Sequence, residues 1–356
     1  FNTPDFIKKA AIEAIENNYS KYPPVNGFLD LRQAISKKFE RDNGLHYSPD
    51  EIVVSTGAKQ SLVNVVLSLV GKGDEVIVFA PYWVSYKAMV DLAGAELVEL
   101  YAGVEKDYKV NAQQLEAAIN PKTRLVMFSS PCNPTGSVYN KEELQAIAQV
   151  IEKNPQVLVI SDEIYEHINF LGKHESIGQF KNIQDRVITV NGVSKSFAMT
   201  GYRIGYLGAP KWVADAANKL QGQFTSGANA VAQMAAKAAV EATPEQVQYM
   251  KDAFEKRKNL VLNRLRDIPG FKVNDPKGAF YIFPEISEMF GRKTPQGKII
   301  EDSADFCNYI LEETYVSVVT GAAFGAPNCM RISYATSEDL LEKALDRIKM
   351  AVGKLS

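Results

Sequence analysis

A lysine and an arginine stand close together in the segment from Asn191 to Tyr206, NGVSKSFAMTGYRIGY. Lys195 follows Ser194 and precedes Arg203, between two apolar runs that are typical of buried strands. Open α/β sheets bind their ligands in loops at strand ends. A lysine there forms a Schiff base with a carbonyl compound when its surroundings favour the free amine, whereas an arginine stays charged and suits a phosphate. Taken alone, Lys195 is better interpreted as an exposed loop lysine, and only the other residues of the chain favour a role in chemistry.

A carboxylate closes another apolar run, in the segment from Val157 to His167. Asp162 ends this run, and a buried aspartate is costly unless a cation such as a protonated ring nitrogen lies beside it. Tyr165 follows three residues later and offers a hydrogen-bond donor. The carboxylates and His167 also suggest a metal, but the chain has only 3 histidines and no second cluster of ligands, so we expect none.

Three further strand ends carry residues that suit a flat, phosphorylated cofactor. Gly57 and Ala58 open a helix whose backbone amides favour a phosphate, although turn glycines are common. Trp83 would lie against a planar ring or pack in the core. Asn133 is held between two prolines in SSPCNPTG, where its amide can donate to a cofactor oxygen.

An arginine interrupts the apolar run from Met330 to Tyr334. Arg331 either lies at an exposed sheet edge or turns into a cleft to bind a carboxylate with its planar guanidinium. Together with the lysine, the strand-end aspartate, the asparagine, the tyrosine, the aromatic ring and the phosphate anchors, it describes a pyridoxal phosphate (PLP) site.

These residues need a scaffold that brings strand ends together. Apolar runs predict strands at 52–55, 75–79, 96–100, 124–128, 157–161, 187–190 and 204–208, with helices at 58–69, 86–93, 112–119 and 141–152. Such alternation is typical of a mainly parallel sheet covered on both faces. Beyond a helical region, strands near 280–283, 316–319 and 330–334 and helices at 304–314 and 337–352 predict a smaller α/β section.

Length and composition bound the possibilities further. A chain of 356 residues predicts two domains, and we expect a large PLP-binding domain at 23–262 and a small domain formed by 1–22 and 263–356. The net charge of −2 argues against nucleic-acid binding. No apolar run approaches the ~18 residues of a membrane span. The 3 scattered cysteines suit neither a disulfide framework nor a zinc site, which favours the cytoplasm.

Ordered motifs along essentially the whole chain resemble the fold type I PLP enzymes of aminotransferase class I/II, close to the bacterial aspartate aminotransferases of the 1β subgroup. They are TPDFIKKAA, KYPPVNGFLDLR, STGAKQSL, PYWVSY, SSPCNPTGSVY, SDEIYEHI, NGVSKSFAMTGYRIGY, GAFYIFP and MRISYATSEDLLEKALDRI. The resemblance implies a large domain with a mainly parallel seven-stranded sheet flanked by helices, plus a smaller α/β domain.

The resemblance also implies how the cofactor is bound. Lys195 would carry PLP as a Schiff base, and Asp162 would pair with its pyridine nitrogen. Asn133 and Tyr165 would hydrogen-bond its phenolic oxygen, and Trp83 would stack on its ring.

The cofactor's phosphate has its own implied partners. The amides of Gly57 and Ala58 and the guanidinium of Arg203 would bind it. Tyr22 would reach the same phosphate from the partner subunit of a homodimer.

By the same resemblance, the substrates are an amino acid and a 2-oxo acid. Arg331 would bind the α-carboxylate beside Asn133 and Trp83, and Lys59 would bind the distal carboxylate unless it is simply a solvated lysine. The implied reaction is ping-pong transfer of the amino group from L-aspartate to 2-oxoglutarate. Alternatives are a broader aminotransferase that accepts prephenate or aromatic substrates, a PLP-dependent C–S β-lyase, and a regulatory module, although the latter would need a basic DNA-binding domain.

Overall fold

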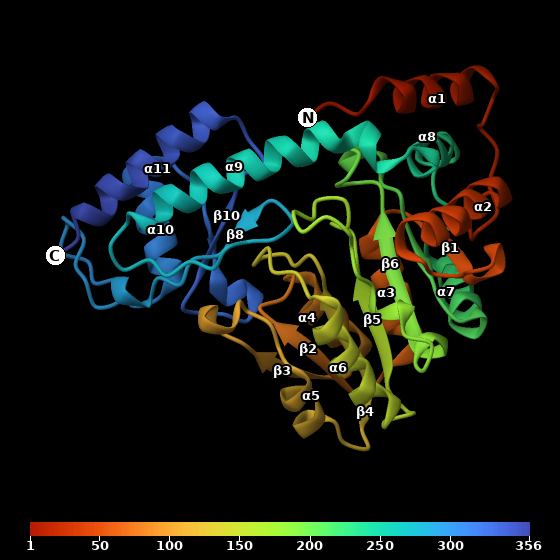
Figure 1. Ribbon diagram of the computed structural model, residues 1–356, viewed down its shortest axis with the longest axis horizontal. Coiled ribbons are helices and arrows are strands. Elements are labelled where there is room, and N and C mark those ends of the chain that lie inside the picture. The colour runs from red at the N-terminus through yellow and green to blue at the C-terminus, as the bar shows by residue number, and fades with distance from the viewer.

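The computed structural model describes residues 1–356. Its centre is a seven-stranded sheet with the order β1-β7-β6-β5-β4-β2-β3 (Figure 1). Only β7 runs antiparallel to its neighbours β1 and β6. The strands are β1 (Ile52–Ser55), β2 (Glu75–Ala80), β3 (Glu96–Tyr101), β4 (Thr123–Ser129), β5 (Leu158–Asp162), β6 (Val187–Gly192) and β7 (Gly205–Gly208). The expected mainly parallel sheet is confirmed, and each of its seven predicted strands lies within two residues of its observed bounds. In the second section, the strand predicted at 316–319 is observed as β9 at Val319–Thr320.

Helices cover both faces of this sheet and bury two apolar layers. The covering helices are α3 (Ala58–Leu69), α4 (Ser85–Ala93), α5 (Ala112–Ala118), α6 (Lys141–Glu152), α7 (Lys211–Phe224) and α8 (Ala230–Glu241). Helices α3, α4 and α7 pack on one layer, in which Leu62 and Val213 meet strand residues such as Met127. Helices α5 and α6 pack on the other. Burial on both faces explains why the central strands are apolar throughout.

Register within the sheet aligns the residues that end its central strands. Ser129 at the end of β4 lies opposite Asp162 at the end of β5, and Asp162 lies opposite Val190 of β6. Strand β6 then leads through Gly192 into the loop that holds Lys195. Parallel strands therefore deliver these side chains to one edge of the sheet.

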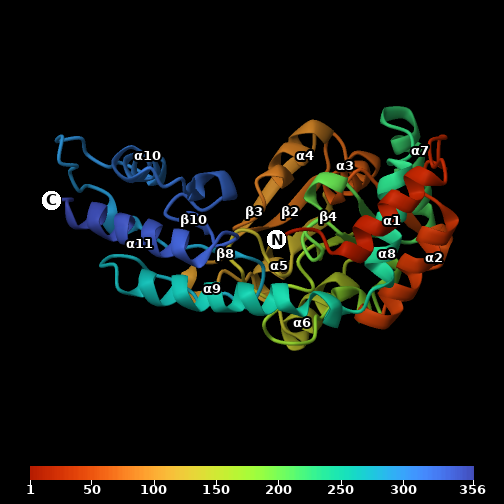
Figure 2. The same cartoon turned by 90° about the horizontal axis from the view of Figure 1, so that it is seen from above.

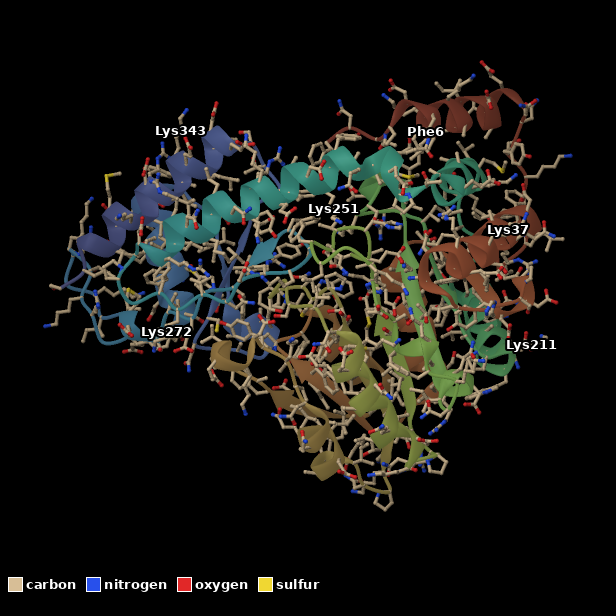
Figure 3. The ribbon with its side chains drawn as sticks, viewed as in Figure 1. Phe6, Lys37, Lys211, Lys251, Lys272 and Lys343 are labelled. Atoms are coloured by element: carbon tan, nitrogen blue, oxygen red, sulfur yellow. The ribbon has the colours of Figure 1, made fainter.

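A second section packs beside that edge. Helix α9 (Gln248–Arg266) leads into it and is followed by α10 (Ser303–Thr314), α11 (Glu338–Gly353) and a small antiparallel sheet of β8 (Tyr281–Ile282), β10 (Met330–Ser333) and β9 (Val319–Thr320). Seen from above, this section extends to one side of the large sheet and α9 links the two parts (Figure 2). Lys251 marks the first turn of α9 near the middle of the molecule, and Lys343 marks α11 beyond it (Figure 3).

The N-terminal helices lie on the large sheet's side of the molecule. Helix α1 (Asp5–Glu16) and α2 (Leu29–Lys38) both pack against α8, and Ile7 shares a core with Ala232 and Ala235 (Figure 1). The expected association of residues 1–22 with residues 263–356 therefore does not describe α1, because its apolar face is covered by α8. Phe1, which precedes α1, reaches α9, where its ring contacts Tyr249 and Phe254. The remaining domain division at residue 262 stays a prediction.

None of the helices combines the length and the apolar character that crossing a membrane requires. The longest, α9, has 19 residues and is rich in charged side chains. The apolar residues of the chain instead form the interior clusters that join helices to strands.

Candidate active site

A cavity of about 330 Å³ lies where the strand ends of the large sheet meet the second section. Nine of the eleven residues singled out from the sequence line it: Ala58, Lys59, Trp83, Asn133, Asp162, Tyr165, Lys195, Arg203 and Arg331. Gly57 lies directly beside it, under the guanidinium of Arg203. Tyr22 is not among the lining residues and is 96% exposed between α1 and α2.

Lys195 presents a weakly solvated amine to the cavity. Its Nζ lies 5.9 Å from the ring centre of Tyr165 and 5.7 Å from that of Phe280, and it forms no ion pair. Burial lowers the pKa of Lys195, and the positive charges of Arg203 and Arg331 lower it further. An amine in such surroundings loses its proton more readily, which is what attack on a carbonyl carbon requires.

Asp162 is a buried carboxylate at the end of β5, with 4% of its surface exposed. The hydroxyl of Tyr86 donates to its Oδ2 at 2.7 Å, and the backbone N–H of Ile164 donates to its Oδ1 at 3.3 Å. Burial raises the pKa of Asp162 to about 6, against the opposing effect of these two hydrogen bonds. The carboxylate thus needs a cation to be fully stabilised in its charged form.

Arg331 lies on β10 and enters the cavity from the second section. Its Nη1 donates to Oδ1 of Asn133 at 2.9 Å, which ties the section to the loop after β4. The guanidinium carbon lies 4.5 Å from the ring centre of Tyr281 and 4.9 Å from that of Phe324. Its buried Nε has no hydrogen-bond partner, so part of the planar donor set is free to bind a carboxylate.

Two hydroxyl groups meet on the same side of the cavity. The Tyr165 and Tyr281 hydroxyl oxygens lie 3.0 Å apart, and burial is the largest cause that raises the pKa of each phenol. Both therefore stay protonated near neutral pH. One hydroxyl donates to the other, and the second proton is left to donate to an oxygen in the cavity.

Backbone amides and an arginine form the anionic end of the cavity. Gly57 precedes α3 with φ of 82°, and a Cβ at that position would collide with the guanidinium of Arg203. A Cβ at Gly205 would collide with the backbone nitrogen of Ala58. These two glycines let the Arg203 side chain and strand β7 approach the first turn of α3, where the amides and the helix dipole favour an anion.

An aromatic ring and a second amine also line the cavity. Trp83 is half-buried, and Nζ of Lys59 lies 4.8 Å from its ring centre. Lys59 is exposed in the first turn of α3 and makes no ion pair, so its charge is available at the cavity mouth.

Sequence reasoning missed several cavity residues and one residue behind them. Tyr281 belongs to the GAFYIFP motif, but only the fold brings its hydroxyl to Tyr165. Tyr86 begins the helix predicted at 86–93, three residues after Trp83, against whose ring it packs. A tyrosine on the buried side of a helix usually needs a hydrogen-bond partner, and this was the only indication of its role in the sequence. The remaining lining residues that were not singled out are Leu62, Ser129, Ile164, Ser194 and Thr200.

Comparison with known proteins agrees with this geometry. The family model described as Aminotransferase class I and II matches residues 1–348. A probable aspartate/prephenate aminotransferase of Rhizobium leguminosarum bv. phaseoli is 45% identical, over 99% of this chain and 89% of the relative. The crystal structure of the aspartate aminotransferase from Rhizobium meliloti superposes with a TM-score of 0.97 at 40% identity, covering 100% of this chain and 90% of that one. The Thermus thermophilus aspartate aminotransferase with maleate gives a TM-score of 0.91 at 38% identity, covering 99% and 89%. The chain belongs to the aminotransferase class I and II family.

Proposed function

We propose that this aminotransferase uses PLP to move the amino group of L-aspartate to 2-oxoglutarate, giving oxaloacetate and L-glutamate. The observation that carries the proposal is one cavity with an unpaired amine at Lys195, a buried carboxylate at Asp162 and a carboxylate-binding guanidinium at Arg331. These three groups match three parts that the reaction must bind: the electrophilic carbonyl carbon, the protonated ring nitrogen and the substrate carboxylate.

The chain's own groups fit PLP. Asp162 would hold the protonated ring nitrogen, which supplies the cation that its buried charge lacks. Asn133 and Tyr165 would hydrogen-bond the phenolic oxygen, and Trp83 would cover the ring. Support comes also from Ser129, whose buried hydroxyl lines the cavity without a hydrogen-bond partner. Unsatisfied buried polar atoms of this kind are uncommon without a ligand.

At the other end of the cofactor, the Gly57 and Ala58 amides and Arg203 would hold the phosphate. The close approach of Arg203 to Gly57 supports this assignment, since a guanidinium against a helix N-terminus makes a strongly positive site.

PLP supplies an electron sink that stabilises the negative charge developing at the substrate's Cα. Lys195 would hold the cofactor's carbonyl carbon, and its amine, when free, would be the base that moves the proton from the substrate's Cα. Asp162 would keep the ring nitrogen protonated. Arg331 would orient the substrate by binding its α-carboxylate. Asn133 accepts a hydrogen bond from Arg331 through Oδ1 and would donate its amide N–H to the cofactor's phenolic oxygen, so that it connects the two binding sites.

The preference for a dicarboxylic substrate rests on Lys59. Lys59 lines the same cavity as Arg331, with its amine over the Trp83 ring, where it would bind the distal carboxylate of aspartate or 2-oxoglutarate. The relatives with aspartate in their names and the Thermus enzyme with maleate support this choice. The aspartate/prephenate names also favour prephenate as a second amino acceptor.

We also propose that the protein works as a homodimer in the cytoplasm. Tyr22 would reach the phosphate of the partner's site, consistent with a side chain that is 96% exposed and makes no contact with the cavity of its own chain. Ile12 and Ile15 of α1 and Leu29 of α2 are exposed apolar residues near it, as expected of an interface. Sedimentation of the protein tests the dimer, and a monomer at micromolar concentration contradicts it.

The test of the reaction is an absorption spectrum of the PLP-loaded protein, before and after L-aspartate and then after 2-oxoglutarate. We expect the band of the lysine-bound cofactor to disappear with aspartate and to return with 2-oxoglutarate, while oxaloacetate and glutamate accumulate. Return of the band with prephenate supports the second acceptor. Release of pyruvate, ammonia and a thiol from a cysteine S-conjugate, without loss of the band, would instead identify a lyase. An unchanged spectrum with aspartate would reject the substrate assignment.

A further inference from the structure

Behind the cavity, a tyrosine that does not line it is hydrogen-bonded to Asp162. Tyr86 is the second residue of α4 and is fully buried. Its hydroxyl lies 2.7 Å from Oδ2 of Asp162. An ionised carboxylate only accepts hydrogen bonds, and burial next to that carboxylate raises the pKa of the phenol far above its ordinary value. The tyrosine is therefore a permanent donor.

The surroundings of Tyr86 fix where this donor points. Its backbone N–H donates to the carbonyl of Trp83 at 2.9 Å, and its ring meets the Trp83 ring edge-on at 5.8 Å. The side chain is packed in the core between α4 and the sheet, together with Met127 and Ile160. The same short segment thus carries the ring that faces the cavity and the hydroxyl that faces Asp162.

The two hydrogen bonds to Asp162 leave its remaining acceptor positions for the cavity. Tyr86 and the N–H of Ile164 each use one oxygen, and Asp162 lines the cavity whereas Tyr86 does not. Without the hydroxyl, one oxygen of a buried charge would lose its donor. The carboxylate would then be free to rotate and would hold its charge less well.

We propose that Tyr86 is a positioning residue for the cofactor, whose hydroxyl keeps the Asp162 carboxylate charged and turned toward the ring nitrogen. This inference rests on the proposed PLP site and adds a residue that contacts neither cofactor nor substrate. The hydroxyl acts on the reaction through Asp162.

The test measures PLP binding to the cofactor-free protein with four variants. The chain has two tryptophans, Trp83 and Trp212, and only Trp83 lines the cavity. Quenching of tryptophan fluorescence on addition of PLP therefore reports binding. We expect Tyr86→Phe to raise the PLP dissociation constant about ten- to hundredfold, because hydrogen bonds to charged groups contribute about 1.5–3 kcal/mol. Tyr47→Phe is the matched control, since it removes a buried hydroxyl that contacts Thr189 outside the cavity.

A double-mutant cycle separates this role from a merely structural one. In the Asp162→Asn background, Tyr86→Phe should weaken PLP binding no further, because the charge on which the hydroxyl acts is already absent. PLP affinity should rise with pH as Asp162 ionises, and Asp162→Asn serves as the baseline that lacks this rise. In Tyr86→Phe the midpoint of the rise should lie at a higher pH, because the charged carboxylate has lost a donor. If Tyr86→Phe does not fold but the double variant does, the unpaired carboxylate is responsible and the proposal stands.

Three results would overturn the proposal. They are wild-type PLP affinity in Tyr86→Phe, an equal further loss in the Asp162→Asn background, and failure of both Tyr86 variants to fold while Tyr47→Phe folds. Absence of PLP binding by the unaltered protein would reject the proposed function itself, so that the two failures are distinguishable.

Discussion

Replacing Asp162 with asparagine measures how much the buried, charged carboxylate lowers the free energy of unfolding. The residue is 4% exposed, and burial raises the pKa of its carboxyl from 3.8 to about 6. One pKa unit corresponds to about 1.4 kcal/mol. In the cofactor-free protein, the charged Asp162 therefore lowers the free energy of unfolding by about 3 kcal/mol at pH 8. We expect Asp162→Asn to recover most of this amount. An asparagine of the same shape still accepts from Ile164 through its oxygen, and its amide N–H can donate to the Tyr86 hydroxyl oxygen.

The sign of the pH dependence follows from which state binds the proton more tightly. The folded protein has the higher pKa, so the stability that protonated Asp162 provides is fully present below pH 3.8 and is lost as the pH rises through about 6. Asparagine has no such dependence. The stability gained by Asp162→Asn should therefore be about half as large at pH 5 as at pH 8.

Urea unfolding of the cofactor-free wild-type and Asp162→Asn proteins, at one fixed protein concentration and at pH values from 5 to 8, measures the difference in their free energies of unfolding. Asp185→Asn is the control, because the side chain of Asp185 is 84% exposed and its removal should change stability little at any pH. A gain in Asp162→Asn that is the same at pH 5 and pH 8 would refute the reasoning, as would a loss that grows with pH.

Three substitutions in the cavity test the other assigned roles. Lys195→Ala should abolish turnover while PLP still binds non-covalently, as followed by equilibrium dialysis; substantial turnover would remove Lys195 from its role. Arg331→Lys should lower kcat/KM for aspartate and 2-oxoglutarate alike, by about ten- to hundredfold, because the planar pair with the α-carboxylate is lost. Its control is Arg186→Lys, which alters an arginine bonded to main-chain carbonyls elsewhere. Lys59→Met should lower kcat/KM for aspartate by up to about fivefold, the size expected of an exposed ion pair, and leave phenylalanine unaffected; an equal loss for both would exclude Lys59 as the reader of the distal carboxylate.

Most of the fold could be predicted because apolar runs in this chain are strong signals. The runs that became β2 and β6 are buried on both faces, so their composition alone separates them from amphipathic helices. Strand ends then located Asp162 and the loop of Lys195, since parallel strands end at one edge. The packing of α1 could not be read in this way. The sequence of an amphipathic helix shows that one face is buried but not which neighbour covers that face. For α1 the neighbour is α8 and not the C-terminal section.

The unpredicted parts of the site are those that depend on distance in space. Tyr86 and Asp162 are hydrogen-bonded although they are 76 positions apart in the sequence, and no local pattern links them. The same holds for Tyr165 and Tyr281, which come from different sections of the molecule. Glycine gave a partial signal: Gly57 was expected at a phosphate-binding turn, but the steric need for Gly205 beside Ala58 follows only from the antiparallel pairing of β1 with β7.

The departures from ordinary folding rules gather at the cavity. Asp162 holds a charge in an apolar setting, Arg203 adopts a left-handed backbone with φ of 56° that glycine would adopt more easily, and buried polar atoms of Ser129 and Arg331 lack partners. Each of these costs stability in the isolated chain. The proposed PLP would bring a cationic ring nitrogen to Asp162 and a phosphate to Arg203, and the substrate would bring a carboxylate to Arg331. It follows that PLP and substrate should stabilise the fold through the groups that carry the reaction.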